Sequence, residues 1–170
     1  GAVDVVEDLE ESDQEVFLSY ISASDRKLIK EGLNYPEDSA GRLMQRKFVA
    51  IDDSWNVGNT IDYLRKEKKI LPKDFYEVYL INKNNIVTGI VALGRLMSSN
   101  RKIHLNKIQN KEIRLINVFT DQEEVAYQFN KYAMVSAPVV DWQNKIIGSI
   151  TVDDVVGVIE EEREEDILKL

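Results

Sequence analysis

The sequence contains no cysteine and a single histidine, His104, among its 170 residues. Without cysteine there is no disulfide, no thiolate nucleophile and no Cys-ligated zinc or iron site. One isolated histidine supports neither a zinc site nor a Ser-His-Asp triad, so we expect His104 to be an ordinary loop residue. The chain also has no phosphate-binding loop and no nucleophile–base pair. The sequence therefore indicates that this is not an enzyme.

Long apolar runs and an excess of basic residues are missing as well. No apolar run approaches the roughly 18 to 20 residues of a membrane-spanning helix, and the clusters at 135–140 and 146–150 are short. The 30 acidic and 22 basic side chains give a net charge of −8. Nucleic acid needs a basic surface that displaces its counterions, so it is a poor candidate partner, whereas cations are good ones.

An internal repeat organises most of the chain. Residues 78–91 meet a similar pattern at 137–150 when they are shifted by 59 positions, and both copies read as strand, polar turn, strand. Helical patterns precede the copies at 54–68 and 121–131, and others follow at 93–97 and 152–159. A strand, a helix and a returning strand predict parallel pairing with a right-handed crossover. We expect the two units to pack through their sheets as a pseudo-twofold pair that folds as one body.

A helical region is expected before the repeat. Apolar stripes in residues 4–34 predict two or three short helices, separated near 11–12 and 22–24. The dipeptide Tyr35–Pro36 ends this region, because the residue before proline disfavours helix.

Acidic residues are concentrated near the C-terminus. Val152, Val155, Val156 and Ile159 form an apolar stripe that predicts a helix. Eight acidic residues lie between Asp153 and Asp166, against one basic residue, Arg163.

Glu162, Glu165 and Asp166 share one face of this helix near its C-terminal end. Like charges at these spacings repel, and the helix dipole disfavours anions there. A bound cation would relieve this arrangement, and Mg²⁺ is suited to such carboxylates. The alternative is a solvated charge run on an exposed helix.

Several motifs resemble a known family. Gly148-Ser-Ile-Thr151-Val-Asp-Asp154 resembles the CBS module, whereas the first copy has Ala92 and Arg95 in place of the hydroxyl and the acid. The segment Tyr35-Pro-Glu-Asp-Ser-Ala-Gly-Arg-Leu-Met44 resembles the sequence that leads into the CBS pair of MgtE-type magnesium transporters. The family's further motifs follow in order at 120–126, 137–141, 150–155 and 161–167.

The resemblance implies an α+β fold: a tandem CBS-domain pair, two β-α-β-β-α modules related by a pseudo-twofold axis, preceded by short α-helices. It places the end of a truncated helical N domain at 1–35 and CBS module 1 at 36–98. CBS module 2 falls at 99–158, and the start of the acidic connecting (plug) helix at 159–170. The membrane pore of the family lies outside this chain.

The resemblance also implies metal-binding residues. These candidates are Asp38, Asp121, Glu123, Asp154, Glu162, Glu165 and Asp166. Three of them have structural alternatives: helix capping or first-turn charge for Asp38, a first-turn position for Asp121, and a Thr120–Glu123 capping box for Glu123. Gly157 and Ala133 stand where relatives often place acids, so some sites are expected to be missing or weaker.

The function implied is that of a cytosolic Mg²⁺-sensing regulatory domain of a magnesium transporter, which compacts on Mg²⁺ binding and closes the pore. A homodimer through the CBS modules, at the cytoplasmic face of the cell membrane, is expected with it. One alternative is an adenine-nucleotide sensor in which Thr151 and Asp154 hold the ribose of ATP. Another is an accessory module of an enzyme, for which the chain offers no catalytic constellation.

Overall fold

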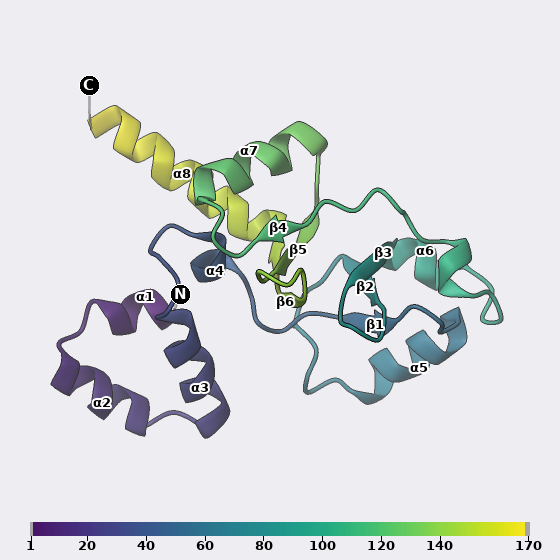
Figure 1. Cartoon of the computed structure of the whole chain (residues 1–170), viewed down its shortest axis with the longest axis horizontal. Coiled ribbons are helices and arrows are strands. Elements are labelled where there is room, and N and C mark those ends of the chain that lie inside the picture. The colour runs from purple at the N-terminus through teal and green to yellow at the C-terminus, as the bar shows by residue number, and fades with distance from the viewer. Residues whose placement is uncertain (1, 169–170) are drawn as a thin grey trace.

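The computed structural model of the chain describes residues 2–168, apart from the side chains of Glu162, Glu165 and Asp166. Three short helices come first: α1 (Ala2–Glu7), α2 (Glu11–Ser19) and α3 (Ala23–Gly32). They form a separate lobe around Val6, Leu18 and Ile29 (Figure 1). The three helices confirm the prediction, although the first break lies at residues 8–10, just before the expected position.

Two modules with the same element order follow the short helix α4 (Ala40–Leu43). The first contains β1 (Ala50–Asp52), α5 (Val57–Lys66), β2 (Glu77–Ile81), β3 (Val87–Ala92) and α6 (Leu93–Ser98). A 3₁₀ turn, η1 (Leu105–Lys107), leads to the second. The second contains β4 (Ile116–Asn117), α7 (Gln122–Tyr132), β5 (Ser136–Val140), β6 (Ile146–Thr151) and α8 (Val152–Leu168).

Each module has a three-stranded sheet in the order β1-β2-β3 or β4-β5-β6. The first pair of strands is parallel and the second pair antiparallel in both sheets. The predicted β-α-β-β-α architecture and its parallel pairing are therefore confirmed.

The repeat is offset by 59 residues from the second strand of each module onward, as predicted, whereas β1 and β4 start 66 residues apart. The difference arises because residues 67–76 connect α5 to β2, but only residues 133–135 connect α7 to β5. The tight turns are equivalent: Asn85 and Asn144 adopt φ values of 62° and 61°. Asparagine tolerates this left-handed conformation better than most residues.

The two modules pack through their sheets. Tyr79, Val87, Ile90 and Ile146 form one buried cluster with contributions from both sheets. The Tyr79 hydroxyl is buried between two serines of the second module, at 2.9 Å from Ser136 Oγ and 2.6 Å from Ser149 Oγ. This shared core confirms that the modules face each other as a pair.

Helix α8 corrects the expected apolar stripe. Val155 and Val158 are buried, but Val156 and Ile159 are 50% and 42% exposed. Val155 packs into the core of the second module together with Val152, and α8 packs against α7. The expected stripe was therefore wrong at Val156 and Ile159. Within residues 2–168, no helix combines the length and apolar character needed to cross a membrane.

Candidate functional site

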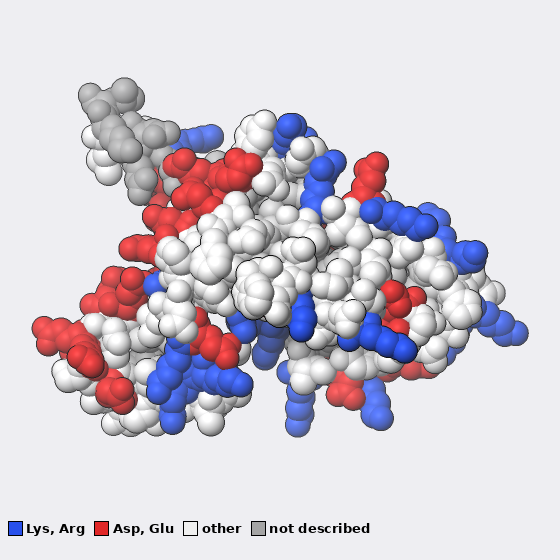
Figure 2. Space-filling view, in the orientation of Figure 1, with Lys and Arg blue, Asp and Glu red and all other residues white. Residues whose placement is uncertain are grey.

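A cleft of about 980 Å³ lies between the N-terminal helices, the segment around α4, and α8. Apolar side chains from α2, α3, α4 and the turn between α2 and α3 form part of its wall: Phe17, Ile21, Leu28 and Leu43. Acidic residues from α1, from α3, from the segment before α4 and from α8 also line it, among them Asp38, Asp154 and Glu161. In the space-filling view, acidic side chains gather over α8 and basic ones over the first module (Figure 2). The cleft is therefore an amphipathic space with carboxylates on opposing elements.

Asp154 lies in the first turn of α8, directly after β6. Its Oδ2 accepts hydrogen bonds from the backbone N–H of Thr151, at 2.9 Å, and from the Thr151 hydroxyl, at 3.1 Å. Gln45 Nε2 lies 3.2 Å from both carboxylate oxygens. The motif that the sequence singled out thus forms a compact polar cluster that includes Gln45, a residue that sequence reasoning missed.

Asp38 lines the same cleft but does not cap a helix. The N-cap of α4 is Ser39, and Asp38 has a left-handed backbone, with φ of 63°, whose carbonyl accepts from the N–H of Gln122 at 2.8 Å. The capping alternative for Asp38 is therefore wrong. Ser39 Oγ is buried beside it and has no hydrogen-bond partner within the described part of the chain.

Asp121 and Glu123 lie at the start of α7, outside the lining of the cleft. Asp121 is the N-cap, and its carboxylate accepts from the N–H of Glu123 at 2.8 Å. The expected capping box beginning at Thr120 was wrong by one residue, because the aspartate, itself a strong N-cap, takes the position. A bridge between Ser39 and Asp121 nevertheless keeps this helix start next to the Asp38 segment.

The predicted acidic face of α8 consists of Glu162, Glu165 and Asp166, whose side chains lie outside the described residues. Glu161 does line the cleft, together with Gly157 and Val158. Sequence reasoning missed Glu161, although its spacing from Asp154, i to i+7, places both on one helical face. Gly157 lies on this wall without a side chain, where relatives were expected to carry an acid.

No group of three or more acidic or histidine side chains is arranged to hold a metal ion, among the side chains that the structure describes. The carboxylates at the cleft belong to separate elements, and Mg²⁺ can be held by one or two carboxylates together with its own water. The arrangement is thus an open space with carboxylates on separate elements and not a preformed cage, and Arg42, Arg46 and Lys47 also line it.

Arginines attach the N-terminal lobe to the segment that enters the modules. The Arg42 side chain is only 6% exposed, and it bonds to Asp4 at 3.1 Å, to Glu7, and to the carbonyl of Tyr35 at 2.9 Å. Burial alone would lower the pKa of Arg42, but its bonds to Glu7 and Asp4 outweigh burial and leave the pKa raised. Arg46 forms a second ion pair with Glu31 at 2.8 Å.

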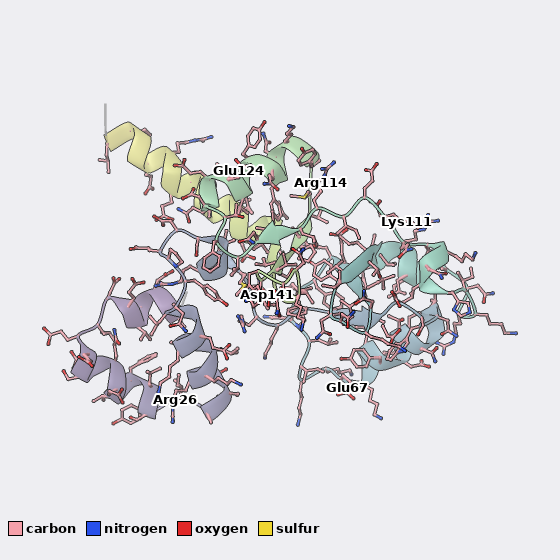
Figure 3. The ribbon with its side chains drawn as sticks, in the orientation of Figure 1. Arg26, Glu67, Lys111, Arg114, Glu124 and Asp141 are labelled. Carbon is pink, nitrogen blue, oxygen red and sulfur yellow. The ribbon has the colours of Figure 1, made fainter. Side chains whose placement is uncertain are left out.

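Two smaller cavities lie between the modules. One, of about 230 Å³, is lined by Glu77, Arg114 and Tyr132. Arg114, which Figure 3 labels, comes from the segment before β4, and its guanidinium lies 3.4 Å from the centre of the Tyr132 ring. The other, of only about 10 Å³, lies beside Thr151 and Tyr76. The cavity beside Thr151 is therefore nearly closed, whereas Asp154 lines the larger cleft.

Polar groups between these cavities are strongly affected by burial. Burial raises the pKa of Tyr79 to about 12. Burial also raises the pKa of Glu77, although the hydrogen bond that Ser136 donates to its carboxylate acts in the opposite direction.

His104 and the two tryptophans lie outside the lining of the cleft. His104 precedes η1 in a loop. Trp55 packs edge-on against Tyr63, whereas Trp142 is 79% exposed in the turn between β5 and β6.

Comparison with known proteins identifies what the chain resembles. A CBS domain model matches residues 106–161. The magnesium transporter MgtE of Thermus thermophilus is 33% identical over 136 residues, which cover 80% of this chain and 30% of that protein. MgtE of Bacillus subtilis is 31% identical over 152 residues, which cover 89% of this chain and 34% of that protein. The chain thus spans about a third of the length of these relatives.

Solved structures give the same result. The soluble part of a magnesium transporter matches with a TM-score of 0.86 at 30% identity, over 95% of this chain and 62% of that one. The cytosolic domain of the Mg²⁺ channel MgtE in complex with ATP matches with a TM-score of 0.85 at 26% identity, over 92% and 63% of the two chains. The CBS pair of a putative Mg²⁺ transporter from Shewanella oneidensis, at 16% identity and a TM-score of 0.73, supports the fold alone.

Proposed function

The chain carries a tandem CBS pair homologous to the cytosolic region of MgtE magnesium transporters, and from this premise we propose that it senses Mg²⁺ and regulates such a transporter. The residues of the cleft would bring the N-terminal lobe and α8 together when Mg²⁺ neutralises their carboxylates. In a full transporter this compaction would hold the pore of the same chain closed. The module itself would perform no catalysis.

One observation carries the proposal: acidic side chains from the α4 segment and from α8 line the same cleft. Asp38 and Asp154 face this space together with Glu161, and carboxylate oxygens are the ligands that Mg²⁺ prefers. The buried Ser39 hydroxyl at the same cleft has no partner within the described residues, and ion-bound water would satisfy it. The other proposed ligands of this or neighbouring sites are Asp121, Glu123, Glu162, Glu165 and Asp166.

Several weak sites are sufficient for a switch. An ion at about ten times its Kd contributes roughly 1.4 kcal/mol to the one form that it binds. Moving a population from mostly open to mostly closed takes about 5.5 kcal/mol, so about four such sites are needed. We propose that a homodimer through the CBS modules supplies equivalent sites in both copies.

Small-angle X-ray scattering across an Mg²⁺ titration tests the proposal. The radius of gyration should fall with MgCl₂ and stay unchanged in KCl of matched ionic strength. Equal compaction in KCl would indicate nonspecific charge screening and would contradict a magnesium sensor. An unchanged shape and an unchanged melting temperature in millimolar Mg²⁺ would also contradict it.

A second candidate function is binding of an adenine nucleotide. It is favoured by the Thr151–Asp154 pair and by the similarity to an MgtE cytosolic domain solved with ATP. In this chain the cavity beside Thr151 is nearly closed, whereas Asp154 lines the larger cleft, so the Thr151 side would have to open for both residues to hold a ribose. Calorimetry with ATP, with and without Mg²⁺, separates the candidates, since strong ATP binding without any Mg²⁺ response favours the nucleotide sensor.

A further inference from the structure

Donors already engage both oxygens of the Asp154 carboxylate in this structure. An ionised carboxylate offers about four lone-pair positions on its two oxygens. The backbone N–H and the hydroxyl of Thr151 both donate to Oδ2, and the Gln45 amide lies 3.2 Å from Oδ1 and from Oδ2. At Oδ1 the Gln45 amide is the donor in contact, so a cation that approaches this oxygen from the cleft competes with Gln45.

Gln45 is the group that can leave. The Thr151 contacts are local, three residues away along the chain, and they belong to the start of α8. The Gln45 contact joins residues 109 positions apart, is exposed, and has the long distance typical of a weak hydrogen bond. When the Gln45 contact breaks, the Asp154 carboxylate can accept a cation, and the first turn of α8 stays folded.

The backbone nevertheless holds Gln45 in place. Its N–H donates to the carbonyl of Ser149 at 2.8 Å, and its carbonyl accepts from the N–H of Ser149 at 2.9 Å. This bridge fixes residue 45 beside β6, so the side chain returns to Asp154 whenever no ligand is present. The donor end of its amide carries a partial positive charge and stands where a cation would approach.

We propose that Gln45 is an internal competitor for Asp154 that sets the Mg²⁺ concentration at which the cleft responds. This inference rests on the proposed function, because it assigns Asp154 to the responding site. A cation bound at Asp154 would break the contact between the segment after α4 and the start of α8. The competition would therefore couple cation binding to the contact between these two elements. Gln45 is thus a positioning residue and not a metal ligand.

The test compares Gln45→Met with the wild-type protein in an MgCl₂ titration followed by small-angle scattering and by calorimetry. Methionine keeps the length of the side chain and the backbone bridge but removes the amide donor. The Mg²⁺ concentration at half response should fall about threefold to tenfold, which corresponds to the loss of one exposed hydrogen bond of ordinary strength. The melting temperature without Mg²⁺ should change little, and Gln45→Ser provides a second variant if methionine perturbs folding.

Gln128→Met is the matched control. Gln128 Nε2 also donates to a carboxylate, that of Glu124, at 3.1 Å on the exposed surface of α7. This variant loses the same kind of bond away from the cleft and should leave the Mg²⁺ response unchanged.

The outcomes separate this inference from the proposed function. A responsive wild type with an unchanged or weakened response in Gln45→Met overturns the inference alone, and a weakened response would make Gln45 a co-ligand. A silent wild type with a responsive Gln45→Met supports the competitor and contradicts sensing by the natural sequence. If both proteins are silent, both ideas are overturned.

Discussion

Glu77 is a partly buried carboxylate at the junction of the two modules, and its burial makes the stability of the fold depend on pH. Ser136 donates to it at 2.6 Å, and the same serine contacts the buried Tyr79 hydroxyl. Burial disfavours the charged form of Glu77 and raises its pKa above the value of an exposed glutamate. The unfolded chain therefore releases this proton at a lower pH than the folded chain does.

The first prediction follows from this difference. The protonated Glu77 side chain stabilises the folded state at pH values below its pKa in the unfolded chain. This contribution is lost as the pH rises through its pKa in the folded chain, so the wild-type carboxylate is unfavourable at neutral pH. Glu77→Gln should raise the free energy of unfolding at pH 7 by on the order of 0.5 kcal/mol, because the amide oxygen still accepts from Ser136. The gain should shrink toward pH 4.

Urea unfolding between pH 4 and pH 7.5 measures this difference. Glu124→Gln on the exposed surface of α7 is the control for the removal of an exposed negative charge. A gain in Glu77→Gln that stayed constant across the range would mean that the Glu77 carboxylate behaves as if it were exposed.

At the same scale, local sequence patterns located some site residues and missed others. The Thr151–Asp154 pair was predictable because a strand followed at once by a helix brings positions three apart together. The contact of Gln45 with Asp154 was not, because it joins residues 109 positions apart and depends on a backbone bridge to β6. The capping alternative for Asp38 was wrong because the residue type does not reveal its left-handed backbone, which leaves Ser39 as the N-cap.

At the scale of elements, the strands were the best predicted part of the fold. Short apolar runs around polar turns recur at the same spacing, and β2–β3 and β5–β6 follow that spacing without a shift. Helix α8 was harder, since several apolar residues occur on more than one of its faces. Which face is buried is decided by α7 and the second sheet, and these contacts are tertiary.

The second prediction concerns the attachment of the N-terminal helices. Arg42 joins α1 to the segment before the modules through Asp4, Glu7 and the Tyr35 carbonyl, and its side chain is almost fully buried. Arg42→Gln should destabilise the docking of α1 by about 1 to 3 kcal/mol, a value below that of a fully buried pair because both acids are partly exposed. The two modules should remain folded.

Hydrogen exchange resolved by residue measures this effect. Amides of α1 and α3 should exchange faster in Arg42→Gln, whereas amides of β2 and β5 should be unaffected. Arg101→Gln is the matched control, because the exposed Arg101–Asp62 pair, at 2.8 Å, should contribute little. Equal loss of protection in all elements would mean that the helices and the modules fold as one unit.

At the scale of the whole molecule, charge is distributed in three blocks. Residues 1–41 contain eleven acidic and three basic side chains, and residues 116–170 contain twelve and four. Residues 42–115, which include the first module, contain fifteen basic and seven acidic side chains. The acidic blocks therefore flank a basic one, and the N-terminal block faces the acidic second module across the cleft. The overall net charge conceals this pattern.

The last prediction concerns the cooperativity of the two modules. Ile146 belongs to the second sheet but packs with Tyr79, Val87 and Ile90 of the first, and its N–H donates to the carbonyl of Asn85 at 3.1 Å. Ile146→Ala should lower the free energy of unfolding by about 2 to 4 kcal/mol, because it leaves a cavity in a shared core. If the pair folds as one body, protection of β2 and β5 amides must fall by the same amount. Trp142→Ala, at an exposed turn of the same module, should leave both strands unchanged, and a loss confined to the second module would show that each half is stable alone.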